Sequence, residues 1–315
     1  MLQIFQPKNT IHFMRYSKRT TVLSFVLMAA SILTLSINWL NWGLDFTGGT
    51  LIEVGFEQSV NLPEVRTVLG EAQYSGAIVQ YFGSSHDILI RLASEEGVKG
   101  SVIGSKILHA LQGADFGQVD MRRIEFVGPN VGAELAENGA LAMIIALLCI
   151  LAYVSLRFEW RLATGAVLSL VHDILITLGI FSFFQLEFDL TVLAALLAII
   201  GYSLNDTIVV FDRIRENFRK LVTASSVDVV DISITQTLSR TLISSLTTLL
   251  VLISLFLVGG ELIHGFATAL LIGIVVGTYS SIYVASAVAI KLGTSRVHMI
   301  PVVVEKEGAD QDPIM

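Results

Sequence analysis

The chain has 315 residues, of which 53% are hydrophobic and only 15% are charged, and its formal net charge is −7. Soluble domains carry about 25% charged residues, so this composition excludes an ordinary soluble protein and places most of the chain in a lipid bilayer. The single cysteine, Cys149, excludes an internal disulfide framework. We interpret it as a small side chain packed among helices. The few basic residues flank apolar segments, which argues against nucleic-acid binding.

Six apolar stretches are each close to the roughly 20 residues that a helix needs to cross a bilayer core of about 30 Å. The first is not followed by a small-residue cleavage site, so we expect it to be retained as a helix. The predicted organisation is an N-terminal segment (1–20), a first transmembrane helix (21–40), an α+β domain with its connectors (41–135), transmembrane helices 2–6 (136–295) and a tail (296–315). The predicted spans are Thr21–Leu40, Gly139–Leu156, Leu162–Phe184, Leu190–Phe211, Thr237–Val258 and Phe266–Ile290.

The short loops predict the orientation, because cytoplasmic loops of membrane proteins are enriched in Lys and Arg. The loops 185–189 and 259–265 contain neither residue type. Six spans with both termini in the cytoplasm account for this pattern. The basic residues that this arrangement places on the cytoplasmic side are Lys8, Arg15, Lys18, Arg19, Arg157, Arg161, Arg213, Arg215, Arg219, Lys220, Lys291 and Arg296.

A polar segment from about Asp45 to Val131 is predicted to fold as a domain outside the membrane. Its pattern has the order β-α-β-β-α-β, which is typical of a ferredoxin-like α+β fold. Asn61 and Glu64 resemble a capping box at the first helix. The predicted strands are Thr50–Phe56, Ala77–Phe82, Asp87–Leu92 and Val119–Val127, and the predicted helices are Leu62–Ala72 and Val98–Leu111.

This domain shows no spacing of nucleophile and base or of metal ligands. We interpret His86 and His109 as ordinary surface or core residues. A fold of this type carries no chemistry by itself, so the domain is interpreted as a binding or interaction module. Beyond Ile300 the short charged tail is expected to be solvated and disordered.

Two ionisable residues lie inside predicted spans, where a charge costs about 2.5–3.5 kcal/mol and marks a candidate functional site. Asp206 lies in the fourth span and Arg240 lies near the start of the fifth. The two helices run antiparallel, so we expect both side chains at a similar depth, facing each other across the bundle. The pair then either serves an ion path or acts as a static ion pair that fixes the register of the helices.

Polar neighbours favour a hydrated interior around this pair. On the fifth span, hydroxyl residues recur at three- and four-residue spacing with Arg240, and such residues share one helix face. The candidate ion path comprises Asp206, Arg240, Asn205, Ser203, Thr237 and Ser244. His172 and Asp173 in the third span form a possible second polar pair, for which the alternative is a hydrogen-bonded contact between helices.

Five blocks of sequence resemble the signatures of the SecD/SecF family, and in particular those of its SecF branch. They occur in the family's order and spacing over nearly the whole chain, and the tail matches least. The blocks are Trp42–Thr50, Phe126–Gly132, Arg157–Arg161, Gly201–Asn217 and Ser280–Ser286.

The first two blocks also form the connectors between the domain and the membrane. Their glycines permit tight or positive-φ backbone, and a proline stiffens the second turn. We expect these connectors to transmit tilt between the bundle and the domain. Their residues are Gly43, Asp45, Gly48, Gly49, Gly128, Pro129 and Gly132.

The resemblance implies a subunit that pairs with SecD to form a resistance-nodulation-division type transporter, in a bacterial inner membrane with the domain in the periplasm. It implies the SecYEG translocon, YajC and YidC as partners and an unfolded preprotein as substrate. It also implies that Asp206 and Arg240 serve an ion path driven by the proton motive force. We expect no cofactor, no metal and no enzymatic activity, since the chain has no phosphate-binding Gly-x-x-x-x-Gly-Lys-Ser/Thr loop.

Three other classes of protein remain as alternatives. Half of a small-molecule efflux pump would need a large apolar cleft in the external domain, for which about 85 residues are few. A purely structural subunit would explain the spans but not a polar stripe beside a buried acid. An intramembrane enzyme would need a paired nucleophile and base on neighbouring spans, and none is found. The sequence does not distinguish proton coupling from sodium coupling.

Overall fold

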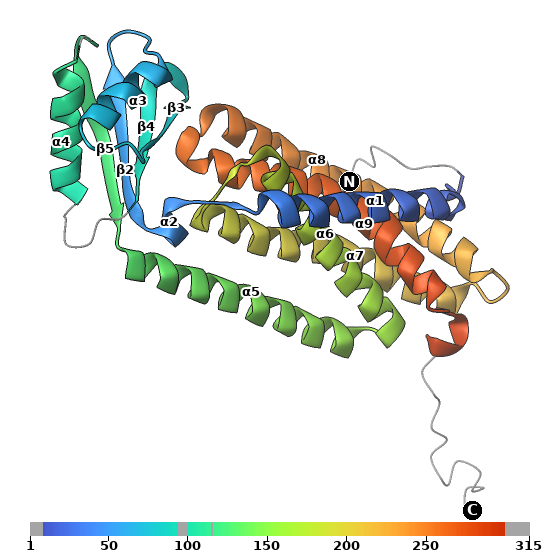
Figure 1. The fold of residues 1–315 in the computed structure, drawn as a ribbon. Coiled ribbons are helices and arrows are strands. Elements are labelled where there is room, and N and C mark those ends of the chain that lie inside the picture. Colours follow the sequence, from blue (N-terminus) through green and yellow to red (C-terminus); the bar gives the residue numbers. More distant parts are fainter. Residues whose placement is uncertain (1–8, 94–99, 115, 300–315) are drawn as a thin grey trace, which may run out of the picture.

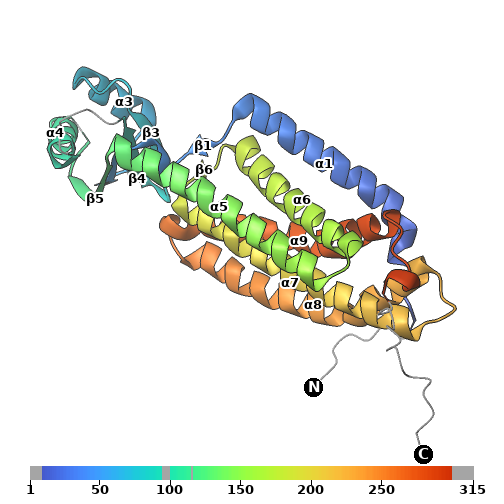
Figure 2. The ribbon, with the colours of Figure 1, turned by 90° about the horizontal axis from the view of Figure 1, so that it is seen from below.

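The structure is a computed structural model that describes residues 9–93, 100–114 and 116–299. The charged tail therefore lies outside the described residues. Long helices form an elongated bundle, and a small α+β domain stands at one end of it (Figure 1). Seen from below, α1 begins and α9 ends at the opposite end of the bundle from this domain (Figure 2). This arrangement is the one that an even number of spans requires.

The bundle contains six helices that are long and apolar enough to cross a membrane, which confirms the predicted number of spans. Three of them, α6, α7 and α9, are about half buried and form the centre, whereas α1, α5 and α8 are mostly exposed. Cys149 is exposed on α5, so its predicted packing among helices is wrong. The helices are α1 (Ser17–Asn38), α5 (Pro129–Arg157), α6 (Trp160–Phe184), α7 (Leu190–Lys220), α8 (Ser226–Val258) and α9 (His264–Lys291), and a 3₁₀ turn over Phe13–Tyr16 precedes α1.

Several helices extend beyond the apolar stretches that predicted them. The helix α7 continues to Lys220 because its polar end is stabilised by side-chain pairs one turn apart, with Glu216 bonded to both Arg213 and Lys220. At the other end of the molecule, α5 begins at Pro129, because proline is well suited to the first turn of a helix. Apolar length thus measures the membrane crossing and not the length of the helix.

The α+β domain has the predicted order of elements. Its sheet has the strand order β3-β4-β2-β5, and every neighbouring pair is antiparallel. Both helices pack on one face of this sheet (Figure 1). The elements are β2 (Gly49–Phe56), α3 (Leu62–Glu71), β3 (Ile78–Phe82), β4 (Ser84–Leu92), α4 (Gly100–Gln112) and β5 (Val119–Val127).

The core of the domain follows the two expected periodicities. Ile52 and Val54 of β2 are two residues apart and fully buried, as are Ile88 and Ile90 of β4. On the helices the buried residues are four apart, with Val65 and Leu69 on α3 and Ile103, Ile107 and Leu111 on α4. These side chains form one apolar cluster, so the domain has a core of its own, separate from the bundle.

The two connectors leave the domain side by side. Gly49, the first residue of β2, pairs with Val127, the last residue of β5. The backbone at Gly48 and Gly49 has φ values of 67° and 133°, which favour glycine. A Cβ atom at Gly132 would lie 2.9 Å from the backbone nitrogen of Gly48, so the second connector packs directly against the first.

Candidate functional site

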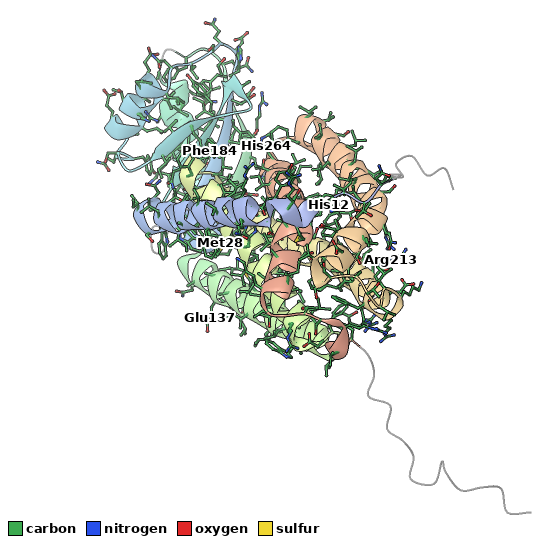
Figure 3. All side chains as sticks on the ribbon, turned by 90° about the vertical axis from the view of Figure 1, so that its right-hand side faces the viewer. His12, Met28, Glu137, Phe184, Arg213 and His264 are labelled. Atoms are coloured by element: carbon green, nitrogen blue, oxygen red, sulfur yellow. The ribbon has the colours of Figure 1, made fainter. Side chains whose placement is uncertain are left out.

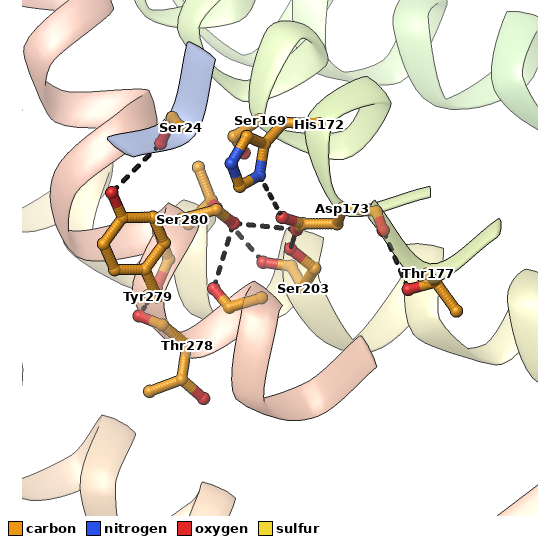
Figure 4. Close-up of polar contacts among 12 residues, drawn as sticks. Ser24, Ser169, His172, Asp173, Thr177, Ser203, Thr278, Tyr279 and Ser280 are labelled. Carbon is orange, nitrogen blue, oxygen red and sulfur yellow. Dashed lines mark hydrogen bonds and ion pairs between the residues drawn. The ribbon is translucent and has the colours of Figure 1, made fainter. Parts of the chain in front are cut away.

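Asp173 of α6 is a fully buried acid with polar partners on three helices. The hydroxyls of Ser203 on α7 and Ser280 on α9 donate to its Oδ2 at 2.6 and 2.7 Å. Its Oδ1 lies 2.9 Å from Nδ1 of His172. The three central helices therefore meet at one carboxylate (Figure 4).

A glycine on α9 permits this meeting. A Cβ atom at Gly277 would lie 3.1 Å from Cβ of Ser203 and 3.5 Å from Oδ2 of Asp173. Small residues let the backbones of membrane helices approach closely. We conclude that Gly277 allows the seryl hydroxyls to reach the acid directly.

His172 extends the network toward α1. Its side chain is 1% exposed, and its ring lies 6.1 Å from the ring of Tyr279. The hydroxyl of Tyr279 donates to the carbonyl of Thr20 at 2.8 Å. It also lies 3.0 Å from the hydroxyl of Ser24 (Figure 4). Within the described part of the chain, Nε2 of His172 has no hydrogen-bond partner. If Nδ1 donates to Asp173, Nε2 is left as a free acceptor.

Asp206 of α7 is also buried, with 4% of its surface exposed. Among the residues that the structure describes, its Oδ2 has no hydrogen-bond partner. Arg240 is near enough for electrostatic attraction, yet the two described side chains form no ion pair within 4.0 Å. In this conformation the acid and the guanidinium are therefore separated, and the alternative of a closed static pair is not realised.

The other predicted site residues are distributed differently. Ser203 bonds to Asp173 and not to Asp206. On α8, the hydroxyls of Thr237 and Ser244 donate to carbonyls of their own helix, at 3.0 and 2.9 Å. Asn205 is exposed on the surface of the bundle. The structure thus brings together His172, Asp173 and Ser203, and leaves Asp206 and Arg240 apart from them.

The connector after α1 is attached to the first turn of α7. The side chain of Asp45 accepts a hydrogen bond from the backbone nitrogen of Leu190 at 3.0 Å. The side chain of Asp189 caps the start of α7 by accepting from the backbone nitrogen of Val192 at 2.8 Å. The strand β1 (Asn41–Trp42) pairs with β6 (Glu187–Phe188) beside these caps. This connector therefore contacts the same helix that carries Ser203 and Asp206.

Aromatic rings and one arginine complete the junction. The ring of Trp42 lies 5.4 Å from those of Phe46 and Phe188. Arg91 of β4 donates to the carbonyl of Trp42 at 3.2 Å and also forms an ion pair with Glu187. The α+β domain is thereby joined to the loop between α6 and α7.

Glu187 makes this junction sensitive to pH. Burial raises the pKa of its carboxyl above the ordinary value of 4.5, and Arg91 opposes that rise. The folded protein thus holds this proton more tightly than the unfolded chain. The contribution that Glu187 thereby makes to the free energy of unfolding is fully present below pH 4.5. It is lost as the pH rises through the raised pKa of the folded protein.

We therefore expect Glu187→Gln to unfold at the same temperature as the wild type near pH 4, and at a higher temperature near pH 7. Near pH 7 the charged carboxylate of Glu187 must lose its water to be buried. Where this desolvation penalty exceeds the attraction to Arg91, the uncharged glutamine is the more stable residue. Thermal unfolding of the detergent-solubilised proteins between these pH values measures the difference. A lower unfolding temperature for the variant at pH 7 would show that the ion pair with Arg91 outweighs its burial.

Sequence reasoning missed several of these partners. Ser280 belongs to a recognised block, but its contact with Asp173 crosses between helices far apart in the chain. Asp45 was predicted only as part of a connector, and Arg91 was not singled out. The sequence signal for such a contact is the charge of Arg91, which stands in an otherwise apolar end of its strand.

Comparisons with known proteins agree over nearly the full length. Residues 34–60 match the family described as SecD/SecF GG Motif, and residues 106–295 match Protein export membrane protein SecD/SecF, C-terminal. The chain is 61% identical to protein translocase subunit SecF of Vibrio alginolyticus over 99% of both chains. It is 49% identical to the same subunit of Escherichia coli O157:H7, covering 99% of this chain and 97% of that protein.

A solved structure shares the fold. The crystal structure of SecDF, a translocon-associated membrane protein from Thermus thermophilus, matches with a TM-score of 0.82 and 35% identity, covering 93% of this chain and 39% of that longer chain. A super-membrane-facing form of SecDF matches with a TM-score of 0.68.

Fold and site together define a multi-pass membrane protein with one α+β domain and a bundle that encloses buried acids. The relatives that it matches are named as protein translocase subunits, which are transport components rather than conventional enzymes. The chain is a member of the SecD/SecF family of protein export membrane proteins.

Proposed function

We propose that this protein is the SecF-type subunit of the protein-export machinery and uses an ion gradient to assist the movement of preproteins across the inner membrane. Both termini then lie in the cytoplasm and the α+β domain lies in the periplasm. The proposed partners are SecD, the SecYEG translocon, YajC and YidC. The full-length likeness to translocase subunits supports this role.

The observation that carries the ion coupling is the state of Asp206. It is buried at membrane depth with an unpartnered oxygen, and Arg240 exerts attraction without closing on it. An acid held in this way can take up a proton or a small cation and lose its net charge. Each elementary charge that crosses the membrane supplies about 2.3 kcal/mol per 100 mV, which is enough to shift a two-state equilibrium.

Neutralising Asp206 removes its attraction for Arg240, so the bundle repacks. The Asp173 network of α6 is bonded to the same helix α7 through Ser203, so it moves when α7 moves. Movement of α7 reaches the connector through the cap that Asp45 makes at Leu190. The connector continues directly into β2, so the domain moves with the helix. Release of the ion to the cytoplasm resets the cycle.

An exposed face of α7 supports pairing with SecD. Small residues recur along it at Ala194, Ala198 and Gly201, and exposed Asn205 follows. Arg240 of α8 is also exposed. Polar groups at membrane depth are costly when they face lipid, whereas small residues permit close helix packing. A second membrane subunit covering this face satisfies both requirements.

The proposed function is tested in inverted membrane vesicles that contain the Sec machinery with this protein. A preprotein is first arrested part-way with ATP, and ATP is then removed. We expect completion of export to depend on the ion gradient and to fall severalfold when an ionophore dissipates it. A proton-selective and a sodium-selective ionophore, applied in sodium-free and sodium buffers, identify the ion. Completion at an equal rate without any gradient would leave only a structural role.

A further inference from the structure

A groove opens on the side of the bundle between α1, α6 and α9. Its volume is about 310 Å³, at the lower end of small-molecule sites. Its walls are largely apolar, and Met28 of α1 is labelled in Figure 3. Phe25 and Leu168 at its edge are 67% and 47% exposed, so the groove faces the surroundings of the bundle. The walls include Phe25, Met28, Leu168, Val284, Ala287 and Val288.

The groove has a polar group at each end. At the deep end is His172, whose Nε2 has no partner among the described residues. At the other end is Lys291, the last residue of α9, which is exposed. Lys291 follows Tyr279, the neighbour of the His172 ring, by about 18 Å along a helix. The groove-lining residues of α9 run from Tyr283 to Lys291, about 12 Å along a helix. Half of a bilayer core is about 15 Å thick, so the groove covers most of one leaflet.

At the end of the bundle opposite the α+β domain, some cations form ion pairs with acids and others do not. Around α7, Asp212 pairs with Arg157 and Arg215, and Glu216 pairs with Arg213 and Lys220. Among the residues that line the groove, Lys291 carries the charge, and the nearby acid Asp231 is already bonded to the backbone nitrogen of Met14 and to His12. Within the described ranges, the cations at the start of α1 and the end of α9 form no ion pair. They are Arg15, Lys18, Arg19 and Lys291.

We propose that this groove binds one acyl chain of an anionic phospholipid, from the leaflet on the side opposite the α+β domain, with the lipid phosphate at Lys291. The apolar walls and the opening toward the bilayer suit a hydrocarbon chain and not a soluble anion. Each cation near an anionic membrane surface contributes about 1 kcal/mol of attraction. The unpaired cations therefore select an anionic headgroup over a zwitterionic one.

The test uses the full chain, co-purified with its SecD-type partner and placed in nanodiscs. The nanodiscs carry phosphatidylglycerol or phosphatidylcholine with a photoreactive group on the acyl chain. After illumination, cross-linked peptides are identified by mass spectrometry. We expect adducts on residues 20–28 and 283–291, with severalfold higher yield for phosphatidylglycerol.

Two variants separate this site from general lipid contact. Val284→Phe fills the groove and should lower the yield at these peptides severalfold. Lys291→Gln should lower the phosphatidylglycerol yield by roughly fivefold and leave the phosphatidylcholine yield nearly unchanged. The matched controls are Ala142→Phe on the exposed face of α5 and Lys220→Gln on α7, and both should leave the yield unchanged.

Equal yields for the two lipids, or a phosphatidylglycerol yield that Lys291→Gln leaves unchanged, would overturn the proposal. A yield that Val284→Phe does not lower would show annular lipid only. If Val284→Phe fails to fold, Lys291→Gln decides the question alone, because Lys291 is exposed at the end of its helix and its loss removes no packing. None of these outcomes depends on ion-driven export.

Discussion

Asp206→Asn is expected to abolish gradient-dependent export while the protein still inserts and folds. Asparagine has nearly the same shape as aspartate but carries no charge and cannot take up a proton in its place. Because Oδ2 of Asp206 has no hydrogen-bond partner in the described structure, the substitution breaks no bond at this atom. Export after ATP removal should fall severalfold, to the level of the wild type without a gradient.

Asp212→Asn is the matched control for this variant. Asp212 lies on the same helix, but it is half-exposed and pairs with Arg157 and Arg215. Asp212→Asn changes the net charge of the chain by the same amount as Asp206→Asn. It should leave gradient-dependent export close to that of the wild type. Unchanged export in Asp206→Asn would defeat the proposed ion path, whereas equal loss in both variants would indicate a general effect of charge.

Asp173→Ala is expected to destabilise the bundle by about 2–5 kcal/mol. The substitution leaves the hydroxyl of Ser203 and one ring nitrogen of His172 without a partner, and both residues are buried. The hydroxyl of Ser280 loses its bond to Asp173 but keeps the carbonyl of Gly277 as an acceptor. Each buried polar group that loses its partner costs about 1–3 kcal/mol. Thermal unfolding in detergent and resistance to protease measure the loss.

Asp173→Asn separates this structural role from a role in ion transfer. The amide oxygen still accepts from the two serines, so most of the stability should remain while the charge is lost. Ser286→Ala is a control on the same bundle, because the buried hydroxyl of Ser286 has no partner among described residues and its removal should cost little. A stable Asp173→Asn protein with normal export would show that Asp173 only holds helices together.

Much of the fold was predictable because it follows from local patterns. Apolar runs located the six spans, and alternation of apolar residues located the four strands of the domain sheet. Asp206 stood out because a lone acid in an apolar run is costly. These signals all lie within one segment of the chain, where spacing alone defines a helix face or a strand face.

The network around Asp173 was not predictable in the same way. Ser203 and Ser280 are ordinary polar residues of two other helices, and their contact with Asp173 depends on the helix crossing at Gly277. The attachment of Asp45 to α7 likewise joins segments 145 positions apart. Contacts of this kind arise from packing, which the spacing within a single segment does not encode.

The pairing of Gly49 with Val127 has a mechanical consequence. Since both chain crossings into the α+β domain are adjacent, the domain is covalently attached at one corner, and we expect it to tilt about that corner. A strand of eight residues such as β2 is about 27 Å long. A tilt of about 20° at the attached corner would carry the far end of such a strand through roughly 9 Å, nearly the length of three extended residues. A small rotation of the helices inside the membrane would thus produce a larger displacement of the far end of the α+β domain outside it.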